Sequence, residues 1–241
     1  MANENIHFES HTLQKFDDEL NKLLTQMLEM GGLVQKQLTD ALDAIDSLDS
    51  ELAEKVVETE GKVDSMEIEI DRSCANIIAM RQPAASDLRM ILAITKVVRD
   101  LERIGDEAAK VANIALLIIE NGSAPVGTLQ VRHVGSHVQK MLNQILDAYS
   151  KFDVDGALEV ARQDKAVDEE YRGAMRELMM HMMEDARCIG YVLNLTWAVR
   201  SLERIGDHSK NIAEQLIYSV QGIDVRHITL KQMKKQVKRN R

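Results

Sequence analysis

The sequence predicts an all-α protein made of two similar three-helix bundles in tandem, with six long helices in total. Only two prolines occur, and aromatic residues make up 3% of the chain against 45% hydrophobic residues, which favours helices over sheets. Apolar residues recur at helical spacing over long segments. The hexapeptide Leu-Glu-Arg-Ile-Gly-Asp also occurs twice, at 101–106 and 202–207, which indicates an internal repeat.

The first helix is expected over residues 9–48, with an apolar stripe that includes Phe16 and Ile45. Gly31 and Gly32 interrupt this stripe. Each glycine costs roughly 1 kcal/mol relative to alanine inside a helix. The pair therefore indicates either a local kink or the close approach of another helix.

Turn residues separate the second helix from its neighbours. Asp49 and Ser50 both suit the N-cap of a helix that is expected to reach about Met80. Gln82-Pro83 ends that helix, because the residue before a proline avoids the α conformation. The third helix is expected over residues 84–120.

The densest cluster of turn residues lies at 121–128 and marks the predicted domain boundary. The first domain is residues 1–120 and the second is 128–221. At an offset of 104 the second domain repeats the first, so that Gly135 matches Gly31 and Asp168 matches Asp64. The offset is 101 at the hexapeptide, so the second copy lacks about three residues near its last turn.

Residues 222–241 form a basic tail. Its cations are Lys231, Lys234, Lys235, Lys238, Arg239 and Arg241. We expect this tail to be flexible and solvated. The alternative is contact with anionic lipid or an acidic partner, which would give at most peripheral association with a membrane.

The bulk composition excludes several classes of protein. A formal net charge of −9 argues against nucleic acid as a partner, because phosphate binding requires a basic surface. Cys74 and Cys188 are too few for a disulfide scaffold and are expected to be reduced and buried. No apolar run approaches the ~20 residues of a membrane span, and residues 1–10 do not resemble a signal peptide. We therefore expect a soluble cytoplasmic protein.

Carboxylates at i,i+4 spacing flank the apolar seams of the second and third helix of each domain. They are Glu60, Asp64, Glu67, Asp71, Glu102, Asp106, Asp164, Asp168, Glu203 and Asp207. Antiparallel packing could bring the two stripes of one domain together. Like charges at this spacing destabilise a helix by a few tenths of a kcal/mol per pair, so their repetition requires an explanation. One interpretation is an oxygen-ligand site for Mg, Mn, Ca or Fe.

The other interpretation of these carboxylates is a set of salt bridges. Arg99 can reach Glu102, and Lys110 can reach Asp106. In the second copy Arg200 matches Arg99 and Lys210 lies near Asp207. Spacing alone leaves both interpretations open.

Three further residues stand out in the two hexapeptide regions. Gly105 and Gly206 are expected to mark close helix contacts. His208 replaces Glu107 of the first copy and is expected to be a surface group.

Several motifs together resemble the PhoU family of phosphate-signalling regulators. They are Arg81-Gln82-Pro83, Ser86-Asp87-Leu88-Arg89, the two hexapeptides, and Asn211-Ile212-Ala213-Glu214 after Asp207-His208. The resemblance extends to about Gly222, so the basic tail lies outside it. It implies two similar three-helix bundles, as the periodicity also predicts.

The resemblance further implies a non-enzymatic, commonly dimeric, cytoplasmic negative regulator of the phosphate regulon. Such proteins are thought to link the ATPase subunit of a phosphate ABC transporter to a phosphate-sensing histidine kinase. Some members hold metal clusters at Glu/Asp-x-x-x-Asp motifs, which match the carboxylate pairs here and imply Mg, Mn or Fe. Tyr171 and Met175 replace Glu67 and Asp71 in the second copy, which weakens the resemblance there.

Two other functions remain open from the residues. A carboxylate-bridged di-metal protein with a storage or redox role would need a Glu-x-x-His pair on each of two helices, and the only such spacing is Glu4 to His7. A purely structural helical scaffold would bind neither metal nor transporter. The sequence contains no Gly-rich phosphate loop and no nucleophile motif, so it gives no indication of catalysis.

Overall fold

The computed structural model describes residues 14–122 and 128–240. These residues form helices and contain no strand. The helices are α1 (Gln14–Ser47), α2 (Ser50–Arg81), α3 (Ala85–Asn121), α4 (Thr128–Ser150), α5 (Val154–Glu184), α6 (Ile189–Gln221) and α7 (Leu230–Arg239), with a 3-10 turn (Ala186–Cys188) before α6.

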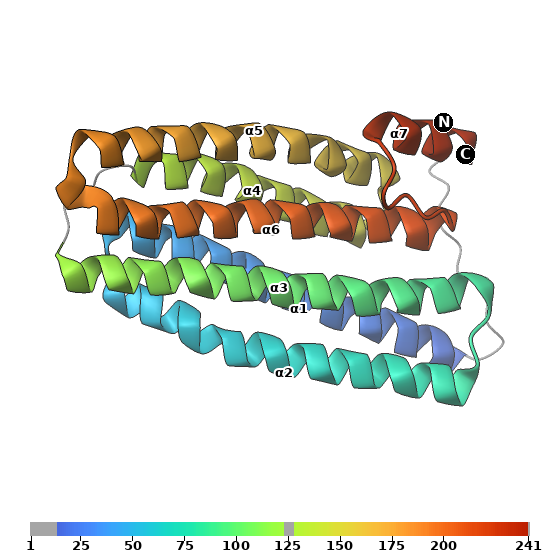
Figure 1. Ribbon diagram of the computed structural model, residues 1–241. Helices are drawn as coiled ribbons and strands as arrows, with labels where there is room; N and C mark the ends of the chain where they lie inside the picture. The colour runs from blue at the N-terminus through green and yellow to red at the C-terminus, as the bar shows by residue number, and fades with distance from the viewer. Residues whose placement is uncertain (1–13, 123–127, 241) are drawn as a thin grey trace.

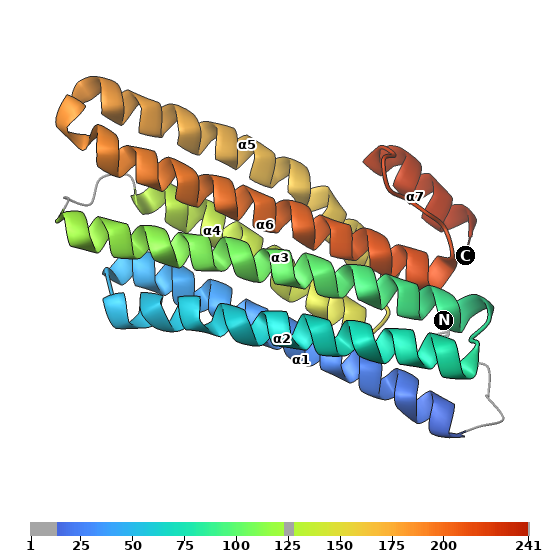
Figure 2. The same ribbon diagram turned by 60° about the horizontal axis from the view of Figure 1, so that its bottom comes forward.

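The helices form two antiparallel three-helix bundles, as the repeat predicts. α1, α2 and α3 make the first unit, and α4, α5 and α6 make the second (Figure 1). α3 and α6 lie side by side through the middle of the molecule and form the most extensive helix pair (Figures 1 and 2). The buried apolar residues of both units join into one continuous core. The two units are therefore packed as one body.

The turn chemistry explains where the helices begin and end. Asp49 is the N-cap of α2 and accepts a hydrogen bond from the Leu52 amide at 3.0 Å, and Asp153 caps α5 in the same way. Gln82 takes a left-handed conformation (φ 48°) before Pro83 and ends α2, as predicted. Most of the predicted boundary at 121–128, residues 123–127, lies outside the described residues.

Glycines allow α1 and α4 to approach closely between the two units. A methyl group added at Gly31 would lie 2.5 Å from a methyl carbon of Leu146 on α4. The repeat-related Gly135 of α4 receives Leu42 of α1 in the same way. Gly32 has no atom near this position. Of the two predicted alternatives, the close approach is confirmed, and Gly31 carries it.

Gly105 and Gly206 also mark close contacts, here within each unit. A methyl group at Gly105 of α3 would lie 3.3 Å from Val63 Cγ1 of α2. The same addition at Gly206 of α6 would lie 3.3 Å from Val167 Cγ1 of α5. The expectation of close helix packing at both hexapeptides is confirmed. This packing brings the flanking carboxylates of the paired helices together.

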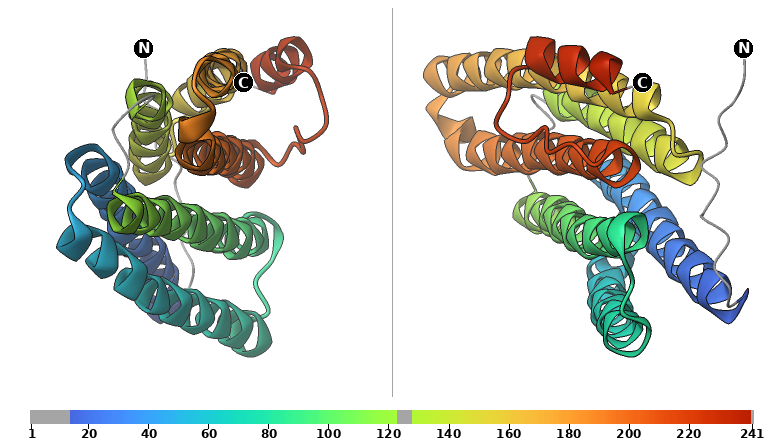
Figure 3. Two further views of the ribbon diagram at one scale, coloured as in Figure 1. Left: turned by 60° about the vertical axis from the view of Figure 1, so that its left-hand side comes forward. Right: turned by 90° about the vertical axis from the view of Figure 1, so that its right-hand side faces the viewer.

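The expectation of a flexible tail at 222–241 differs from the structure, because residues 230–239 form α7. Thr229 and Gln232 make a reciprocal capping box at its start. Met233 and Val237 are buried, and α7 lies against α5 (Figure 3). The basic residues stand on the outer side of an amphipathic helix, so composition alone hid its apolar stripe.

Replacing Val237 with aspartate is expected to release α7 from α5, because it places a charge in a buried apolar contact. Limited trypsin digestion monitored by mass spectrometry measures the effect. We expect at least a tenfold faster cleavage at the lysines of α7, with Lys238→Asp on the exposed side as the control. Equal cleavage rates for parent and V237D would contradict the docked helix.

Among the described residues, no helix is long and apolar enough to cross a membrane. Both cysteines are free: Cys74 is buried, and Cys188 is half-buried. Burial raises the pKa of the Cys74 thiol to about 12, so that thiol stays protonated at neutral pH.

Candidate metal centres

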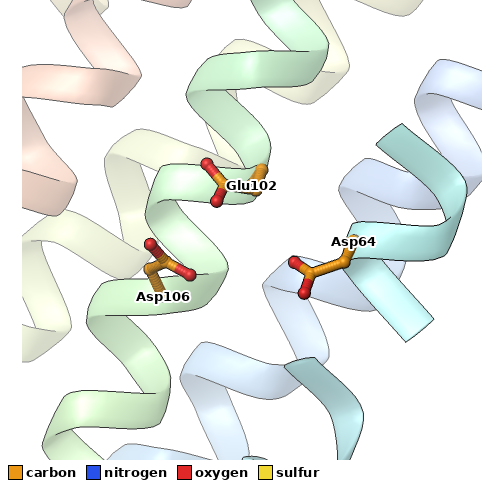
Figure 4. Close-up of side chains that lie close together, drawn as sticks. All are labelled: Asp64, Glu102 and Asp106. Atoms are coloured by element: carbon orange, nitrogen blue, oxygen red, sulfur yellow. The ribbon is translucent and has the colours of Figure 1, made fainter. Parts of the chain in front are cut away.

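Three carboxylates from two helices converge in the first unit. Asp64 extends from α2 towards Glu102 and Asp106, which lie one turn apart on α3 (Figure 4). One oxygen atom from each of these side chains lies within 4.8 Å of the others. The close packing at Gly105 sets this spacing, because it brings the two helix flanks near one another. The predicted meeting of the two acidic stripes is therefore observed.

The acids around this cluster have perturbed ionisation. Burial raises the pKa of Glu60, and the nearby charges of Asp106 and Asp64 raise it further. Burial and the charges of Asp71 and Asp64 raise the pKa of Glu67. Glu102 shows the same direction, from burial and then from Asp106. The fold thus holds several carboxylates close together in partly buried positions, where their mutual repulsion raises their pKa values.

The second unit repeats the arrangement. Asp168 on α5 converges with Glu203 and Asp207 on α6, again with one oxygen from each within 4.8 Å of the others. Desolvation and the charges of Asp164 and Asp168 raise the pKa of Asp207. Burial and the charge of Asp207 raise the pKa of Glu203.

The first acidic stripe is longer than the second at one end only. Burial raises the pKa of Asp71, and Asp71 in turn acts on Glu67, so both extend the first cluster along α2. In the second unit Tyr171 stands in place of Glu67, and the Arg200 guanidinium lies 5.7 Å from its ring centroid. A cation–aromatic contact therefore replaces a carboxylate there.

Salt bridges accompany both clusters but do not follow the predicted pairs throughout. Arg103 lies 3.3 Å from Glu102 and 3.5 Å from Asp106. Lys110 pairs with Glu107 at 2.9 Å and not with Asp106.

In the second unit Arg200 pairs with Glu203 at 2.9 Å. The repeat-related pair of Arg99 with Glu102, which the spacing also predicted, does not form among the described residues, where Glu102 pairs with Arg103. Lys210 pairs with Asp164 at 2.7 Å and not with Asp207. Each of these lysines therefore pairs with an acid other than the predicted one.

The second cluster is the more fully compensated. Arg172 lies 3.6 Å from Asp168, in addition to the bridges made by Arg200 and Lys210. Arg103 is the cation that bridges the first cluster among the described residues. The first cluster also contains more acids. It therefore has the larger uncompensated negative charge.

The donor set fits a hard cation. Three carboxylate oxygens from two helices suit Mg, Mn or Fe, which take oxygen ligands and can complete their coordination with water. A bound divalent ion would offset the repulsion that raises the pKa of Glu102 and of its neighbours. Asp64, Glu102 and Asp106 would hold such an ion in the first unit, and Asp168, Glu203 and Asp207 in the second.

His208 was expected to be a surface group, and the structure shows instead that it makes a contact between the two units. Its Nδ1 lies 2.8 Å from Asp100 Oδ1, so it joins α6 to α3, and only 18% of its side chain is exposed. The repeat-related Glu107 makes the reciprocal link, with its Oε1 2.9 Å from Arg204 Nη1. The difference between His208 and Glu107 at the same position of the repeat marked this site in the sequence. The sequence did not show which residues of the opposite helix the two side chains would contact.

Together these features define a class: an all-helical tandem-repeat protein with a three-carboxylate cluster between two helices of each unit. The model of the PhoU domain matches the chain twice, at residues 27–115 and 131–216. The chain therefore belongs to the PhoU family, as its motifs predicted.

Named relatives agree with this assignment. The phosphate-specific transport system accessory protein PhoU homolog of Pseudomonas aeruginosa is 55% identical over 231 residues, which cover 96% of each chain. The corresponding PhoU protein of Escherichia coli K12 is 43% identical and covers 93% of each. The crystal structure of PhoU from Pseudomonas aeruginosa matches with a TM-score of 0.84 at 55% identity, over 86% of this chain and all of that one.

Proposed function

We infer that this protein is a non-enzymatic accessory regulator of phosphate-specific transport. The observation that carries this inference is the 55% identity, over nearly the whole of both chains, to a relative named as an accessory protein of that system. The two-unit fold provides long exposed helix faces for contact with other proteins. We place the protein in the cytoplasm, where the ATPase subunit of such a transporter is found.

Its expected partners are that ATPase subunit and a phosphate-sensing histidine kinase, between which the protein would act as a negative modulator. Deleting the gene should leave phosphate-starvation genes expressed in phosphate-rich medium, and the intact gene should restore repression. Affinity capture of tagged protein from its own cells should retain the ATPase or the kinase. Unchanged expression after deletion would overturn the regulatory role. If affinity capture retained neither the ATPase nor the kinase, the result would favour a structural scaffold.

We also propose that the first acidic cluster binds a divalent cation, Mn or Mg before others. The proposal is supported by the convergence of Asp64, Glu102 and Asp106 and by their limited compensation by cations. The alternative of a di-metal storage or redox protein required the Glu4 to His7 spacing, which lies outside the described residues. Iron-dependent oxygen consumption by the purified protein would support that alternative.

Adding Mn²⁺ to metal-free protein is expected to raise its melting temperature by several degrees. A ligand at 100 times its Kd stabilises a fold by about 2.7 kcal/mol, which corresponds to roughly 5–10 degrees for a chain of this size. The double variant Glu102→Gln/Asp106→Asn should lose most of the shift, while the matched Glu203→Gln/Asp207→Asn should retain most of it. The site would be refuted if Mn²⁺ caused no shift in melting temperature and elemental analysis of the untagged protein found no stoichiometric metal.

We further propose that the protein is a homodimer that pairs through the α5–α6 end of the second unit. Met179, Met183, Leu193 and Trp197 are exposed there, with Trp197 60% exposed. Large exposed apolar residues that gather on one face are typical of protein interfaces. Met179 and Met183 add flexible apolar side chains, which can adapt to a partner surface.

Replacing Trp197 with glutamate is expected to shift the protein from dimer to monomer, because a charge would be buried in an apolar contact. Sedimentation equilibrium measures the dimer dissociation constant, which we expect to rise at least tenfold. Lys96, the repeat-related residue in the first unit, provides the control as Lys96→Glu. A monomeric parent, or an unchanged W197E dimer, would contradict this interface.

A further inference from the structure

A cavity of about 680 Å³ lies between α3, α6 and the segment at 222–229 that leads to α7. Cationic side chains reach it from all three elements. They are Lys96, Arg99, Arg103, Lys210 and Arg226. Its volume falls within the range of about 300–1,000 Å³ that is typical of small-molecule sites.

Several of these cations keep their charge available to the cavity. Arg99 makes no hydrogen bond or ion pair with any residue that the structure describes, although its charge acts on Glu67 of α2 and opposes the rise in the pKa of that acid. Lys96 lies 5.3 Å from the ring centroid of Tyr218, a contact that leaves its positive charge intact. The acids that pair with Arg103 lie on its own helix, towards the metal cluster.

The internal repeat provides a matched comparison across the α3–α6 contact. In one half, the buried Glu107 neutralises Arg204 of the opposite helix and Lys110 of its own. In the other half His208 takes the place of Glu107, so Arg103 receives no carboxylate from α6. The cavity lies in this second half. Asp100 stands here where the other half has Ser201, so this half keeps one carboxylate, but that carboxylate pairs with His208 and not with Arg103.

Acids beside the cavity offset part of its positive charge. Arg226 donates from Nε and Nη2 to Asp224, which leaves its Nη1 without a hydrogen bond to any described residue, and Lys210 pairs with Asp164. Asp100 already accepts from Asn211 Nδ2 at 3.1 Å and pairs with His208 Nδ1 at 2.8 Å. Glu214 is buried, and its burial raises its pKa to about 7, so it is partly protonated at neutral pH. Neither Asp100 nor Glu214 makes an ion pair with Arg99 in the described part of the chain.

The cavity wall also contains an unused hydrogen-bond acceptor. Gln215 is 5% exposed, and its Oε1 has no hydrogen-bond partner. A buried acceptor without a partner costs stability unless a ligand or water supplies a donor. Gln215 lines the cavity, so a ligand hydroxyl group there could provide that donor.

We propose that this cavity binds a small anion with more than one phosphoryl group, held by Arg99, Arg103 and Arg226. Guanidinium groups bind phosphoryl oxygens through paired, charge-assisted hydrogen bonds, and cations on three elements can serve separate phosphoryl groups. A single phosphate ion cannot span cations distributed around a cavity of this volume. A nucleoside polyphosphate and an inorganic polyphosphate share the required chemistry.

Isothermal titration calorimetry of the metal-free full chain with tripolyphosphate, ATP and inorganic phosphate tests the proposal. We expect micromolar binding of tripolyphosphate or ATP and at least tenfold weaker binding of phosphate. Tighter binding of ATP than of tripolyphosphate would identify a nucleotide, because only ATP offers hydroxyl groups to Gln215. Absence of binding by both polyanions at 1 mM would overturn the site.

Variants distinguish this cavity from general attraction to a basic surface. Arg99→Gln should weaken binding at least tenfold, while Arg200→Gln, the same change at the repeat-related position, should alter it less than twofold. The double variant Asp100→Ser/His208→Glu gives the half that contains the cavity the residues found at the repeat-related positions, Ser201 and Glu107. It should abolish binding, because the new glutamate would pair with Arg103. Thermal melts check that each variant folds, and equal losses in R99Q and R200Q would overturn the assignment.

Discussion

Replacing Glu214 with glutamine is expected to raise the free energy of unfolding by about 3 kcal/mol at pH 8, from the change of its pKa from 4.5 to about 7. Burial on α6 is the main cause of that change. Above pH 7 the folded protein must hold this carboxylate charged in a poorly solvated position. Glutamine has a similar shape and removes that charge.

The sign of the pH dependence follows from proton linkage. Between pH 4.5 and about 7 the folded state binds the Glu214 proton more tightly than the unfolded state does. The contribution of Glu214 to stability therefore falls as the pH rises through this window. Urea unfolding at pH 5 and pH 8 measures the difference, and E214Q should gain far more at pH 8.

Glu107 provides a control of opposite sign. It is also buried, but it pairs with Lys110 and Arg204, each at 2.9 Å. Removing its charge leaves both partners without their acid, so Glu107→Gln should lower stability at pH 8. If E214Q were destabilising at pH 8, Glu214 would have to be held by contacts that compensate its burial.

Replacing Gly31 with valine is expected to lower the free energy of unfolding by about 1–3 kcal/mol, as overpacking of a close contact does. The added carbons would overlap Leu146 on α4. The two helices would have to separate, and the repeat-related contact of Gly135 with Leu42 would open with them. Urea unfolding with two-state analysis measures the loss.

The adjacent glycine is the matched control. Gly32 is exposed, and an added methyl group meets no atom within 4 Å. Gly32→Ala should therefore stabilise the protein by up to about 1 kcal/mol through helix propensity. Leu146→Ala should cost less in the G31V background than in the parent, because it removes the overlap. Additive effects would show that Gly31 and Leu146 do not interact.

Much of the fold could be predicted from local signals. Helical periodicity, Asp49 and Gln82-Pro83 predicted the helices and their ends, because capping and turn chemistry act between residues close in the chain. The hexapeptides predicted the duplication and the close packing at Gly105 and Gly206. The helix at 230–239 was missed, because its high charge concealed the stripe of Met233 and Val237.

The candidate metal centres were only half predictable. Spacing placed Glu102 and Asp106 on one flank and four acids on the facing helix, and the structure shows that Asp64 is the one of those four that converges with them. The salt bridges were harder to predict, because a lysine side chain can reach several acids. Lys110 pairs with Glu107 and not with Asp106, although both lie within its reach along the helix. Only the packed helices show which acid lies nearest.

The sequence by itself determined the helical class, the two-fold repeat and the family, since these depend on periodicity and on residues close in the chain. Only the tertiary structure decided how α3 meets α6. The pairing of His208 with Asp100, the pairing of Glu107 with Arg204, and the cavity beside Arg99 all follow from that contact. Residues 97 and 108 positions apart meet there, and local periodicity carries no information about their distance.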